Sequence, residues 1–500
     1  MTNLSLNLSE SAAMYPDHPA IRLDDDVLRY TDLDDAAARM VTLLREYGVQ
    51  PGDRVALMLP NVPEFAIVFY GVLRAGGVAV PMNPLLKRRE VEYYLADSGA
   101  RVLFGWHEVA TEAEAGAKAA DAQLVAVAPH EFRTHVGERE QADLVSRDGG
   151  DTAVILYTSG TTGRPKGAEL THAGLNTNQA VTARTLIKVG PDDVVMGCLP
   201  LFHVFGLTCG LNTSIANGAT LTLIPRFSPA KALEVIQRDK VTVFEGVPTM
   251  YAAMLGVPDR DTYDVSTLRT CVSGGAALPV EVLRGFEEAF GCIILEGYGL
   301  SETSPVASFN HPDAVRKAGS IGTPIEGVRM RLVDESRRPV QPGQIGEIQI
   351  GGHNVMKSYW NKPDETAATI DSEGWLSTGD MARQDSDGYF FIVDRKKDLL
   401  IRGGYNVYPR EVEEVLYEHP AVAEAAVVGI PHPALGEEIG AAVALKDGTT
   451  ATPQELRDFV KTRIAAYKYP RAVWIVDQLP KGPTGKIQRR EIVVPEGVLR

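Results

Sequence analysis

The segment YTSGTTGRPKGAEL, residues 157–170, combines hydroxyl side chains, glycines and a single lysine in an order that suits an anion. Its three glycines let the backbone turn sharply and bring N–H groups close to a phosphate. Ser159, Thr161 and Thr162 add hydrogen-bond donors, and Lys166 adds a positive charge. Because an apolar run typical of a buried strand leads directly into it, this segment predicts a phosphate-binding loop rather than an ordinary polar surface loop.

A Walker loop is excluded by the residues on either side of the lysine. Such a loop needs glycine directly before the lysine and serine or threonine directly after it, because that hydroxyl holds the metal. Here Pro165 and Gly167 stand at those two positions. The segment therefore predicts phosphate chemistry of a different kind from that of a Walker ATPase.

The composition limits the partners of the chain. Its 500 residues are enough for two or more domains, and 65 acidic against 50 basic side chains give a formal net charge of −15. Nucleic-acid binding needs a basic footprint, so we expect no nucleic-acid partner. Small anionic ligands held in local positive pockets are compatible with this charge, and the sequence leaves monomer or homodimer open.

The amino terminus and the cysteines predict a cytoplasmic protein. Residues 1–20 lack the basic start and apolar run of a signal peptide. The most apolar stretch, Phe65–Val80, is interrupted by Arg74 and two glycines, so we expect no membrane-spanning segment. The four cysteines are scattered without CxxC pairing, as is typical of reduced, buried thiols.

Short apolar runs alternate with helical patterns over the first four hundred residues. Thr31 is the predicted N-cap of an amphipathic helix that continues to about Tyr47, and a second helix is predicted from about Pro63. Strand-like runs lie at 54–59, near 78, and at 101–104, 124–128 and 154–157. This alternation predicts an α/β fold in which helices pack on largely parallel sheets.

The pattern changes near a charged cluster at residues 394–398. About a hundred residues follow, enough for a small independent domain with two strands and a helix that opens near Thr452. We therefore predict a large N-terminal domain over residues 1–394 and a smaller, mobile α+β domain over residues 395–500.

Seven motifs of the chain, taken together and in order, resemble the adenylate-forming superfamily of acyl-CoA synthetases, adenylation domains and luciferases. The motifs are YTSGTTGRPKGAEL, LPLFHVFGL, SGGAAL, EGYGLSET, GWLSTGD, DRKKDLLIRGGYNVYPREVE and PKGPTGKIQRREI. The resemblance extends over essentially the whole chain. It implies a large amino-terminal domain and a small mobile carboxy-terminal domain that meet over one active site.

The chemistry of this superfamily explains why such residue types occur. Its enzymes join a carboxylic acid to the α-phosphate of ATP, release pyrophosphate, and then transfer the acyl group to a nucleophile. The resemblance therefore implies ATP, Mg²⁺ and coenzyme A as cofactors and a small-molecule carboxylic acid as substrate. Because two anions must meet before the first bond forms, the protein has to supply positive charge and donors where charge develops.

The resemblance assigns a nucleotide site. It implies that the loop cradles the β- and γ-phosphates, and that Glu302 holds Mg²⁺, a hard cation that prefers oxygen ligands. Ser301 stands where most members have threonine, and its hydroxyl still reaches the α-phosphate. Tyr298 would stack on adenine, and Asp380 would accept the ribose hydroxyls with help from Arg395. The implied nucleotide-binding residues are Thr158, Ser159, Gly160, Thr161, Thr162, Gly163, Lys166, Gly275, Ala276, Ala277, Gly297, Tyr298, Gly299, Asp380, Ile392 and Arg395.

The carboxy-terminal motifs imply a catalytic lysine on a moving domain. Lys486 matches the lysine of the adenylation step, where a compact ammonium neutralises the carboxylate and the α-phosphate as they approach. Lys397 matches the hinge about which the small domain rotates for the second half-reaction. His203 matches a gate between the acid pocket and the thiol tunnel. The implied catalytic residues are Lys486, Glu302, Ser301 and His203, and the implied CoA-tunnel residues are Gly403, Gly404 and Tyr405.

Two classes compete for the acceptor of the acyl group. The chain resembles either a free-standing acyl-CoA ligase or an adenylation module that loads a carrier protein; a luciferase-like oxygenase and a non-catalytic binding protein are more remote. Fourteen residues follow Lys486, too few for an attached carrier domain, and the motif spacing is closer to that of CoA ligases. We therefore expect CoA as the acceptor.

The implied acid pocket is mostly apolar and partly built of small residues. Malonate-activating relatives carry arginine at the position of Gly297, so a second carboxylate would be uncompensated here and dicarboxylates are disfavoured. We interpret Gly297 as leaving room for a chain or a ring. We expect a medium- or long-chain fatty acid, with a cinnamate- or benzoate-like aryl acid as the alternative. The implied acid-pocket residues are Phe205, Gly206, Val247, Gly274, Gly297, Pro305 and Val306.

Overall fold

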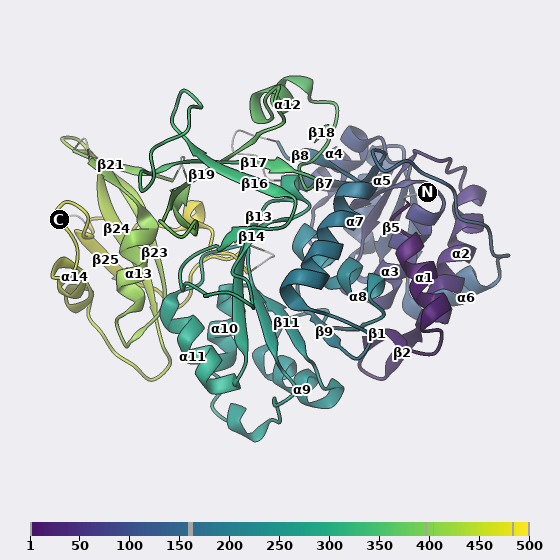
Figure 1. Cartoon of the computed structure of the whole chain (residues 1–500), viewed down its shortest axis with the longest axis horizontal. Helices are drawn as coiled ribbons and strands as arrows, with labels where there is room; N and C mark the ends of the chain where they lie inside the picture. Colours follow the sequence, from purple (N-terminus) through teal and green to yellow (C-terminus); the bar gives the residue numbers. More distant parts are fainter. Residues whose placement is uncertain (1–2, 159–163, 396–397, 404, 483–484, 499–500) are drawn as a thin grey trace.

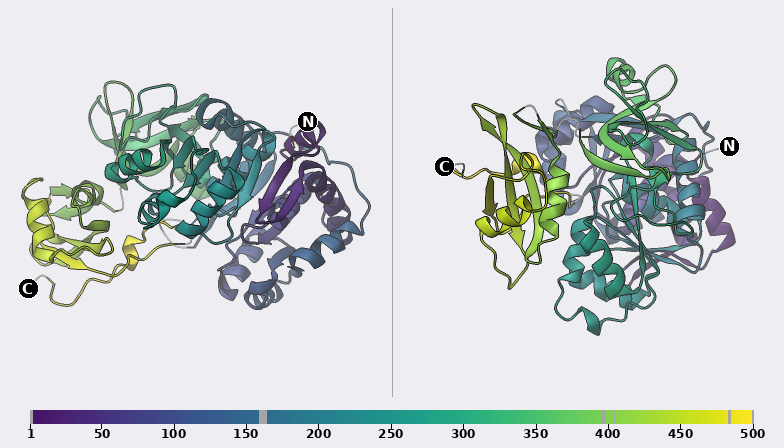
Figure 2. Two further views of the ribbon diagram at one scale, coloured as in Figure 1. Left: turned by 90° about the horizontal axis from the view of Figure 1, so that it is seen from below. Right: turned by 60° about the vertical axis from the view of Figure 1, so that its left-hand side comes forward.

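The computed structural model describes residues 3–158, 164–395, 398–403, 405–482 and 485–498. Within these residues the chain forms three β-sheets before residue 396 and a fourth after it (Figure 1). The fourth sheet and its helices form a separate lobe at one end of the molecule, as both views of Figure 2 show. The predicted α/β class, with a large N-terminal part and a smaller C-terminal part, is confirmed.

A seven-stranded sheet carries the predicted phosphate loop at one of its strand ends. Five of its strands run parallel because helices connect them, and two antiparallel strands extend one edge. Its order is β18-β8-β7-β4-β3-β5-β6. The strands are β3 (Arg54–Met58), β4 (Val78–Pro81), β5 (Val102–Trp106), β6 (Gln123–Val127), β7 (Thr152–Thr158), β8 (Lys166–Thr171) and β18 (Ser358–Tyr359).

Helices cover both faces of this sheet. Helix α3 (Pro63–Arg74) contacts β3 and β4 here and β1 of the neighbouring sheet, so its nearly continuous apolar sequence is buried between two layers. Among the described residues, no helix combines the length and the apolarity that crossing a bilayer requires. The other helices around this sheet are α1 (Leu6–Met14), α2 (Tyr30–Glu46), α4 (Arg88–Ser98), α5 (Ala110–Ala119) and α6 (Pro129–Gly137).

A nine-stranded sheet forms the second layer, with six strands in parallel and antiparallel strands at both edges. Its order is β15-β14-β13-β12-β11-β9-β10-β1-β2. The strands are β1 (Pro19–Leu23), β2 (Asp26–Arg29), β9 (Val194–Gly197), β10 (Thr220–Leu223), β11 (Val243–Gly246), β12 (Thr270–Ser273), β13 (Ile293–Gly299), β14 (Val306–Phe309) and β15 (Thr323–Pro324).

The two faces of this sheet have different cores. Strand residues such as Phe244 and Cys271 pack with helices α9, α10 and α11 on one face, whereas Val243 and Val272 face the shared core on the other. This alternation follows from the two-residue period of a strand. The helices are α7 (His172–Val181), π-helix η2 (Thr182–Ile187), π-helix η3 (Gly206–Asn212), α8 (Thr213–Ala216), α9 (Pro229–Asp239), α10 (Pro248–Leu255) and α11 (Val280–Phe290).

A four-stranded antiparallel sheet, which the sequence pattern did not predict, lies between the parallel layers and the C-terminal lobe (Figure 1). The pairs β16–β17 and β19–β20 are antiparallel and join strands that follow each other in sequence, so no helix lies between their members. Helix α12 lies only in the connection from β17 to β19, so the regular alternation of strand and helix is absent here. The elements are β16 (Val328–Val333), β17 (Gly346–Gly352), α12 (Pro363–Thr369), β19 (Leu376–Gln384) and β20 (Phe390–Arg395).

The C-terminal lobe has its own sheet and core. Buried Val412, Val427, Ile439 and Leu456 pack together beneath its two helices. Helix α14 opens at Pro453, close to the predicted position, and Thr452 caps it because its hydroxyl accepts a hydrogen bond from the amide of the third helical residue. The elements are β21 (Leu400–Arg402), β22 (Tyr405–Val407), α13 (Pro409–Tyr417), β23 (Val422–His432), β24 (Gly436–Leu445), α14 (Pro453–Lys461) and β25 (Ala472–Ile475).

Ion pairs join this lobe to the end of β20. Arg489 contacts Glu413 at 2.6 Å, Asp394 at 3.4 Å and Asp398 at 3.7 Å. The other carboxylate oxygen of Asp394 accepts a hydrogen bond of 3.0 Å from the amide of Arg410. Asp394 is buried, so these donors of the lobe help to compensate its charge. Asp394 therefore connects the end of β20 to the C-terminal lobe.

The observed boundaries differ from the predicted ones by small amounts with local causes. Helix α2 begins at Tyr30, one residue before the predicted cap, because the side chain of Asp32 accepts from the amide of Arg29. The hydroxyl of Thr31 instead donates to the carbonyl of Pro16 at 2.8 Å. The four cysteines are buried thiols, as predicted.

Candidate active site

The predicted phosphate-binding part of the site lies around Glu302. This residue lies in a single 3-10 turn after β13, and one of its carboxylate oxygens accepts hydrogen bonds from Tyr359 at 2.9 Å and Thr158 at 3.3 Å. The ammonium of Lys166 lies 5.1 Å from the centre of the Tyr359 ring. Burial, and then the negative charge of Glu302, raise the pKa of the Tyr359 hydroxyl. This hydroxyl therefore keeps its proton and remains a donor. Three segments that are distant in sequence therefore meet here.

This arrangement fits a nucleotide-borne Mg²⁺. Mg²⁺ is usually held by one or two carboxylates plus phosphate oxygens rather than by a cage of protein ligands. Within the described residues no three histidine, cysteine, aspartate or glutamate side chains form a cluster for a metal, whereas Glu302 supplies one suitable carboxylate. The residues of the loop itself, 159–163, lie outside the described part of the chain.

The ribose side of the predicted site is built from two sheets. Tyr298, near the end of β13, donates a hydrogen bond of 2.5 Å from its hydroxyl to the carboxylate of Asp380 on β19. Asp380 is buried, its amide donates to the hydroxyl of Thr378, and its register partner on β20 is Arg395. Tyr298 and Asp380 are thus brought together, and Ser301 lies three residues beyond Tyr298. The side chain of Arg395 lies outside the described part of the structure.

The adenine side follows the end of β12. Gly275 has a positive φ of 78°, which a side chain would strain, and it is exposed beside the half-buried Ala276 and Ala277. The chain therefore turns sharply at the position where the motif requires close backbone approach. Ile392, also predicted here, lies on β20, and its carbonyl accepts from the guanidinium of Arg410 in the C-terminal lobe. Gly299 closes β13, where a Cβ would lie 2.0 Å from the carbonyl of Pro305.

The segment that carries Lys486 lies against this site. The carbonyl of Gly485 accepts a hydrogen bond of 3.1 Å from the hydroxyl of Thr249, which begins helix α10. A Cβ on Gly485 would lie 3.0 Å from Val247, so the contact is close on this side as well. Burial, and then the positive charge of Lys486, lower the pKa of His203 to about 4. The ammonium is therefore within electrostatic reach of a neutral imidazole.

The predicted acid-pocket residues Phe205 and Gly206 lead into π-helix η3, which contacts β9 and β11 of the nine-stranded sheet. A Cβ on Gly274 would lie 3.0 Å from the ring of Phe205, so the glycine lets this ring pack against the sheet. Gly206 begins η3, and a Cβ there would meet the carbonyl of Pro200 at 2.5 Å. Val306 is buried, and its carbonyl accepts from the amides of two asparagines, which fixes this segment.

The interpretation of Gly297 needs a correction. We expected this glycine to leave room for a chain or a ring of the substrate. Gly297 is instead the direct register partner of Phe309 on β14, and a Cβ there would lie 2.0 Å from the Phe309 ring. The Phe309 ring of the protein itself therefore fills the space beside Gly297, because directly opposed residues of an antiparallel pair share one face. An arginine at this position would therefore meet Phe309.

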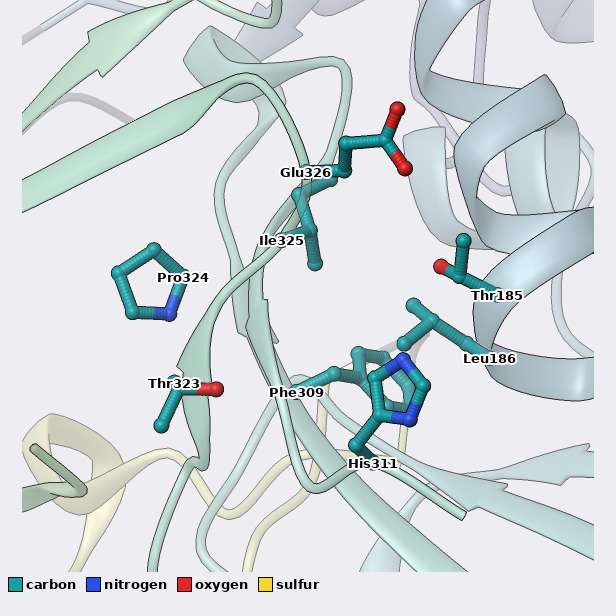
Figure 3. A pocket seen from close by; sticks show the side chains of 8 residues that line it. All are labelled: Thr185, Leu186, Phe309, His311, Thr323, Pro324, Ile325 and Glu326. Atoms are coloured by element: carbon teal, nitrogen blue, oxygen red, sulfur yellow. The ribbon is translucent and has the colours of Figure 1, made fainter. Parts of the chain in front are cut away.

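Phe309 also borders a separate pocket of about 100 Å³ (Figure 3). Figure 3 shows His311 and Leu186 pointing toward this pocket from β14's end and from η2. None of the residues predicted for the active site lines it. A second pocket, of about 200 Å³, lies beside the phosphate loop and is lined by residues that include Lys166, Arg164 and Lys362.

The hinge and CoA predictions are only partly covered by the structure. Lys397 and Gly404 lie outside the described residues. Gly403 has a positive φ of 57°, and the exposed ring of Tyr405 stacks on Tyr467 within the C-terminal lobe. These two residues therefore lie on the lobe's own surface.

Sequence reasoning missed three residues that contact the site. Tyr359 and Thr249 are far in sequence from their partners Glu302 and Gly485, and Phe309 reaches Gly297 only through strand register. Thr249 lies two residues after Val247 in the run GVPT, which the motif analysis did not use.

Comparisons with known proteins agree with this arrangement. Residues 8–360 match the family model of the AMP-binding enzyme, and residues 411–486 match that of the AMP-binding enzyme C-terminal domain. A long-chain-fatty-acid–CoA ligase of Bacillus subtilis is 40% identical, with 98% of this chain and 94% of that protein covered. A feruloyl-CoA synthase of Amycolatopsis is 39% identical, with 96% of each chain covered.

Solved structures give the same result. A benzoate CoA ligase from Burkholderia xenovorans superposes with a TM-score of 0.91 at 32% identity, covering 98% of this chain and 99% of that one. The ATP-bound structure of MatB from Rhodopseudomonas palustris superposes with a TM-score of 0.91 at 32% identity, covering 98% and 97%.

The first prediction concerns the support of Glu302. Tyr359→Phe removes a hydroxyl that donates to a carboxylate, an interaction worth about 1.5–3 kcal/mol. We expect kcat/KM for ATP in pyrophosphate exchange to fall about tenfold or more. Tyr389→Phe is the matched control, because its hydroxyl donates to the carbonyl of Val315, outside the predicted site. Equal losses in the two variants would contradict a specific role for Tyr359.

The second prediction concerns the packing of Gly297. Gly297→Ala places a methyl group against Phe309 and should lower the free energy of unfolding by about 1–3 kcal/mol in chemical denaturation. Phe309→Ala should relieve this conflict, so the double variant should be more stable than the sum of the single effects. Gly190→Ala is the control, since no atom lies within 4 Å of its Cβ position. Additive effects at Gly297 and Phe309 would refute the contact.

Proposed function

Because the chain belongs to the AMP-binding enzyme family and is an AMP-forming acid–thiol ligase, we propose that it activates a monocarboxylic acid at the site beside Lys486 and transfers the acyl group to CoA. One observation carries this proposal: the segment of Lys486 contacts Thr249 and Val247 at the edge of the acid and nucleotide residues. A cation from one domain is thus supplied to a site in the other.

In the adenylation step the protein brings two anions together. Lys486 would neutralise the acid carboxylate and the α-phosphate as they approach, and Lys166 with Thr158 would bind the outer phosphates. Ser301 would donate to the α-phosphate, and Glu302, held by Tyr359, would hold Mg²⁺. When bound, Mg²⁺ supplies positive charge that screens the triphosphate.

The nucleoside would be fixed by residues from two sheets. Asp380, which accepts a hydrogen bond of 2.5 Å from Tyr298, would accept the ribose hydroxyls. Tyr298 would offer its ring to adenine beside the backbone of residues 275–277. His203 would act as a neutral gate, because its lowered pKa of about 4 leaves the ring uncharged at pH 7.

In the thioester step the C-terminal domain would rotate. We propose a boundary between residues 394 and 395, which lies between the two regions matched by the family models. Rotation about Lys397 would withdraw Lys486 and break the contacts of Asp394 with Arg489 and Arg410. Gly403, Gly404 and Tyr405 would then line the thiol tunnel.

The acid is proposed to have an apolar body. Phe205 and Phe309 cover the glycines 274 and 297, and this surrounding gives no compensation for a second carboxylate beside Gly297. A medium- or long-chain fatty acid is the first candidate, supported by the Bacillus subtilis relative. An aryl acid is the second, because two aromatic rings flank this face and are suited to stack on a flat substrate.

An acid panel tests the proposal. The purified protein is given ATP, Mg²⁺ and CoA with octanoate, dodecanoate, benzoate, cinnamate and malonate, and AMP release and thioester mass are measured. We expect AMP and acyl-CoA in equal amounts with at least one monocarboxylate, and at least about a hundredfold lower kcat/KM with malonate, since an unpaired charge costs several kcal/mol. AMP release without thioester would contradict CoA as acceptor. Preference for malonate would contradict the apolar pocket.

A further inference from the structure

We propose that the side chain of Glu245 is a hydrogen-bonding floor of the acid site and selects carboxylic acids that carry a hydroxyl group at the end remote from the reacting carboxylate. This inference rests on the proposed function, since it names a chemical class of acid for the same site. It does not depend on which of the two acid skeletons, aliphatic or aryl, the enzyme uses.

Glu245 is a buried carboxyl group whose burial is not explained by any structural partner among the described residues. It lies on β11 with 1% of its surface exposed, and its Oε1 atom has no hydrogen-bond partner among the described residues. No lysine, arginine or histidine in the described part of the chain forms an ion pair with it. Buried carboxyl groups are normally paired, so an unpartnered one at a site indicates a ligand.

Two neighbours place this carboxyl beside the predicted acid pocket. Glu245 precedes Val247, the extended residue that caps α10, by two residues, a separation of about 7 Å along the chain. On the other side, a Cβ on Gly210 would lie 3.4 Å from Oε2 of Glu245. Gly210 follows Gly206 by about one turn of η3. The carboxyl therefore lies between β11 and η3, next to the predicted pocket residues Val247 and Gly206.

The surroundings of this carboxyl are apolar. Its register partner on β12 is Val272, whose own partner on β13 is Leu295, and both are buried on this face. Because residue 210 is glycine, the backbone of η3 approaches Oε2 closely and places no side chain of its own against it. An apolar wall with one polar group is the usual construction of a ligand site that fixes the orientation of its ligand.

The chemistry of Glu245 selects a hydroxyl. Burial raises its pKa to about 8, so the group is protonated at pH 7 and can both donate and accept a hydrogen bond. A hydroxyl satisfies both functions. A terminal methyl group would leave Oε1 unpartnered, and a terminal carboxylate would bring a second charge into an apolar layer.

Glu296 provides an internal comparison. It is also buried on a neighbouring strand, and burial raises its pKa to about 7. Its side chain, however, accepts a hydrogen bond of 3.1 Å from the amide of Leu278 and feels the charge of Arg410. Glu296 directly follows Leu295 on its strand. Because successive side chains of a strand point to opposite faces, Glu296 lies on the other face of the sheet. Oε1 of Glu296 thus has a structural partner although its Oε2 has none, whereas no hydrogen bond to the side chain of Glu245 occurs among the described residues.

The test uses two pairs of acids that differ by one hydroxyl: cinnamate with para-hydroxycinnamate, and dodecanoate with ω-hydroxydodecanoate. ATP–pyrophosphate exchange of the purified full chain gives kcat/KM for each acid. We expect the hydroxylated member of at least one pair to be preferred by about tenfold, the value of one well-formed hydrogen bond. The pair that shows the preference identifies the skeleton.

Variants then assign the preference. Glu245→Leu should reduce the ratio within that pair to about one, and Glu245→Gln, which keeps a donor and an acceptor, should retain most of it. Glu296→Leu is the matched control and should leave the ratio unchanged. If exchange proceeds but the native enzyme prefers neither hydroxylated acid, or if Glu245→Leu leaves the ratio unchanged, this inference is overturned and the proposed function stands. Absence of exchange with every acid would overturn both.

Discussion

The attraction between a single ammonium and two approaching anions is the constraint on which the rest of the structure depends. An acid carboxylate and a triphosphate repel each other, so a cation must be present when they react and must not obstruct the next step. In the proposed mechanism Lys486 would meet both needs, because it lies near the end of the chain, after the sheet of the separate C-terminal lobe (Figure 2). The hydrogen bond between Gly485 and Thr249, 3.1 Å long, joins two uncharged groups and can be broken at small cost.

The ion pairs at the junction between the lobes also suit a C-terminal lobe that moves. Asp394 is the last acidic residue before the proposed boundary, and it accepts from Arg410 and pairs with Arg489, which both belong to the C-terminal lobe. Arg489 also pairs with Glu413 and Asp398 inside that lobe, so it keeps partners if Asp394 is released. Such shared ion pairs favour one orientation without making it permanent.

Local sequence signals predicted much of the fold, and non-local contacts account for what they missed. The strand before the phosphate loop and the start of the helix near Thr452 depend on neighbouring residues, and both were predicted correctly. The antiparallel sheet of residues 328–395 and the contact of Phe309 with Gly297 depend on pairing between separate strands, which one sequence does not specify. Family motifs supplied the site residues, yet the hydroxyl of Tyr359 on Glu302 lies in none of them.

The central claim is tested most directly by separating the two half-reactions in Lys486→Ala. Pyrophosphate exchange measures adenylate formation, and thioester formation from a supplied acyl adenylate measures the second step. The account predicts that exchange falls by about 10²–10³ while the second step is retained, with Lys481→Ala, whose ammonium pairs with Glu424, close to the native enzyme in both. Equal losses in both half-reactions, or unchanged exchange, would contradict it.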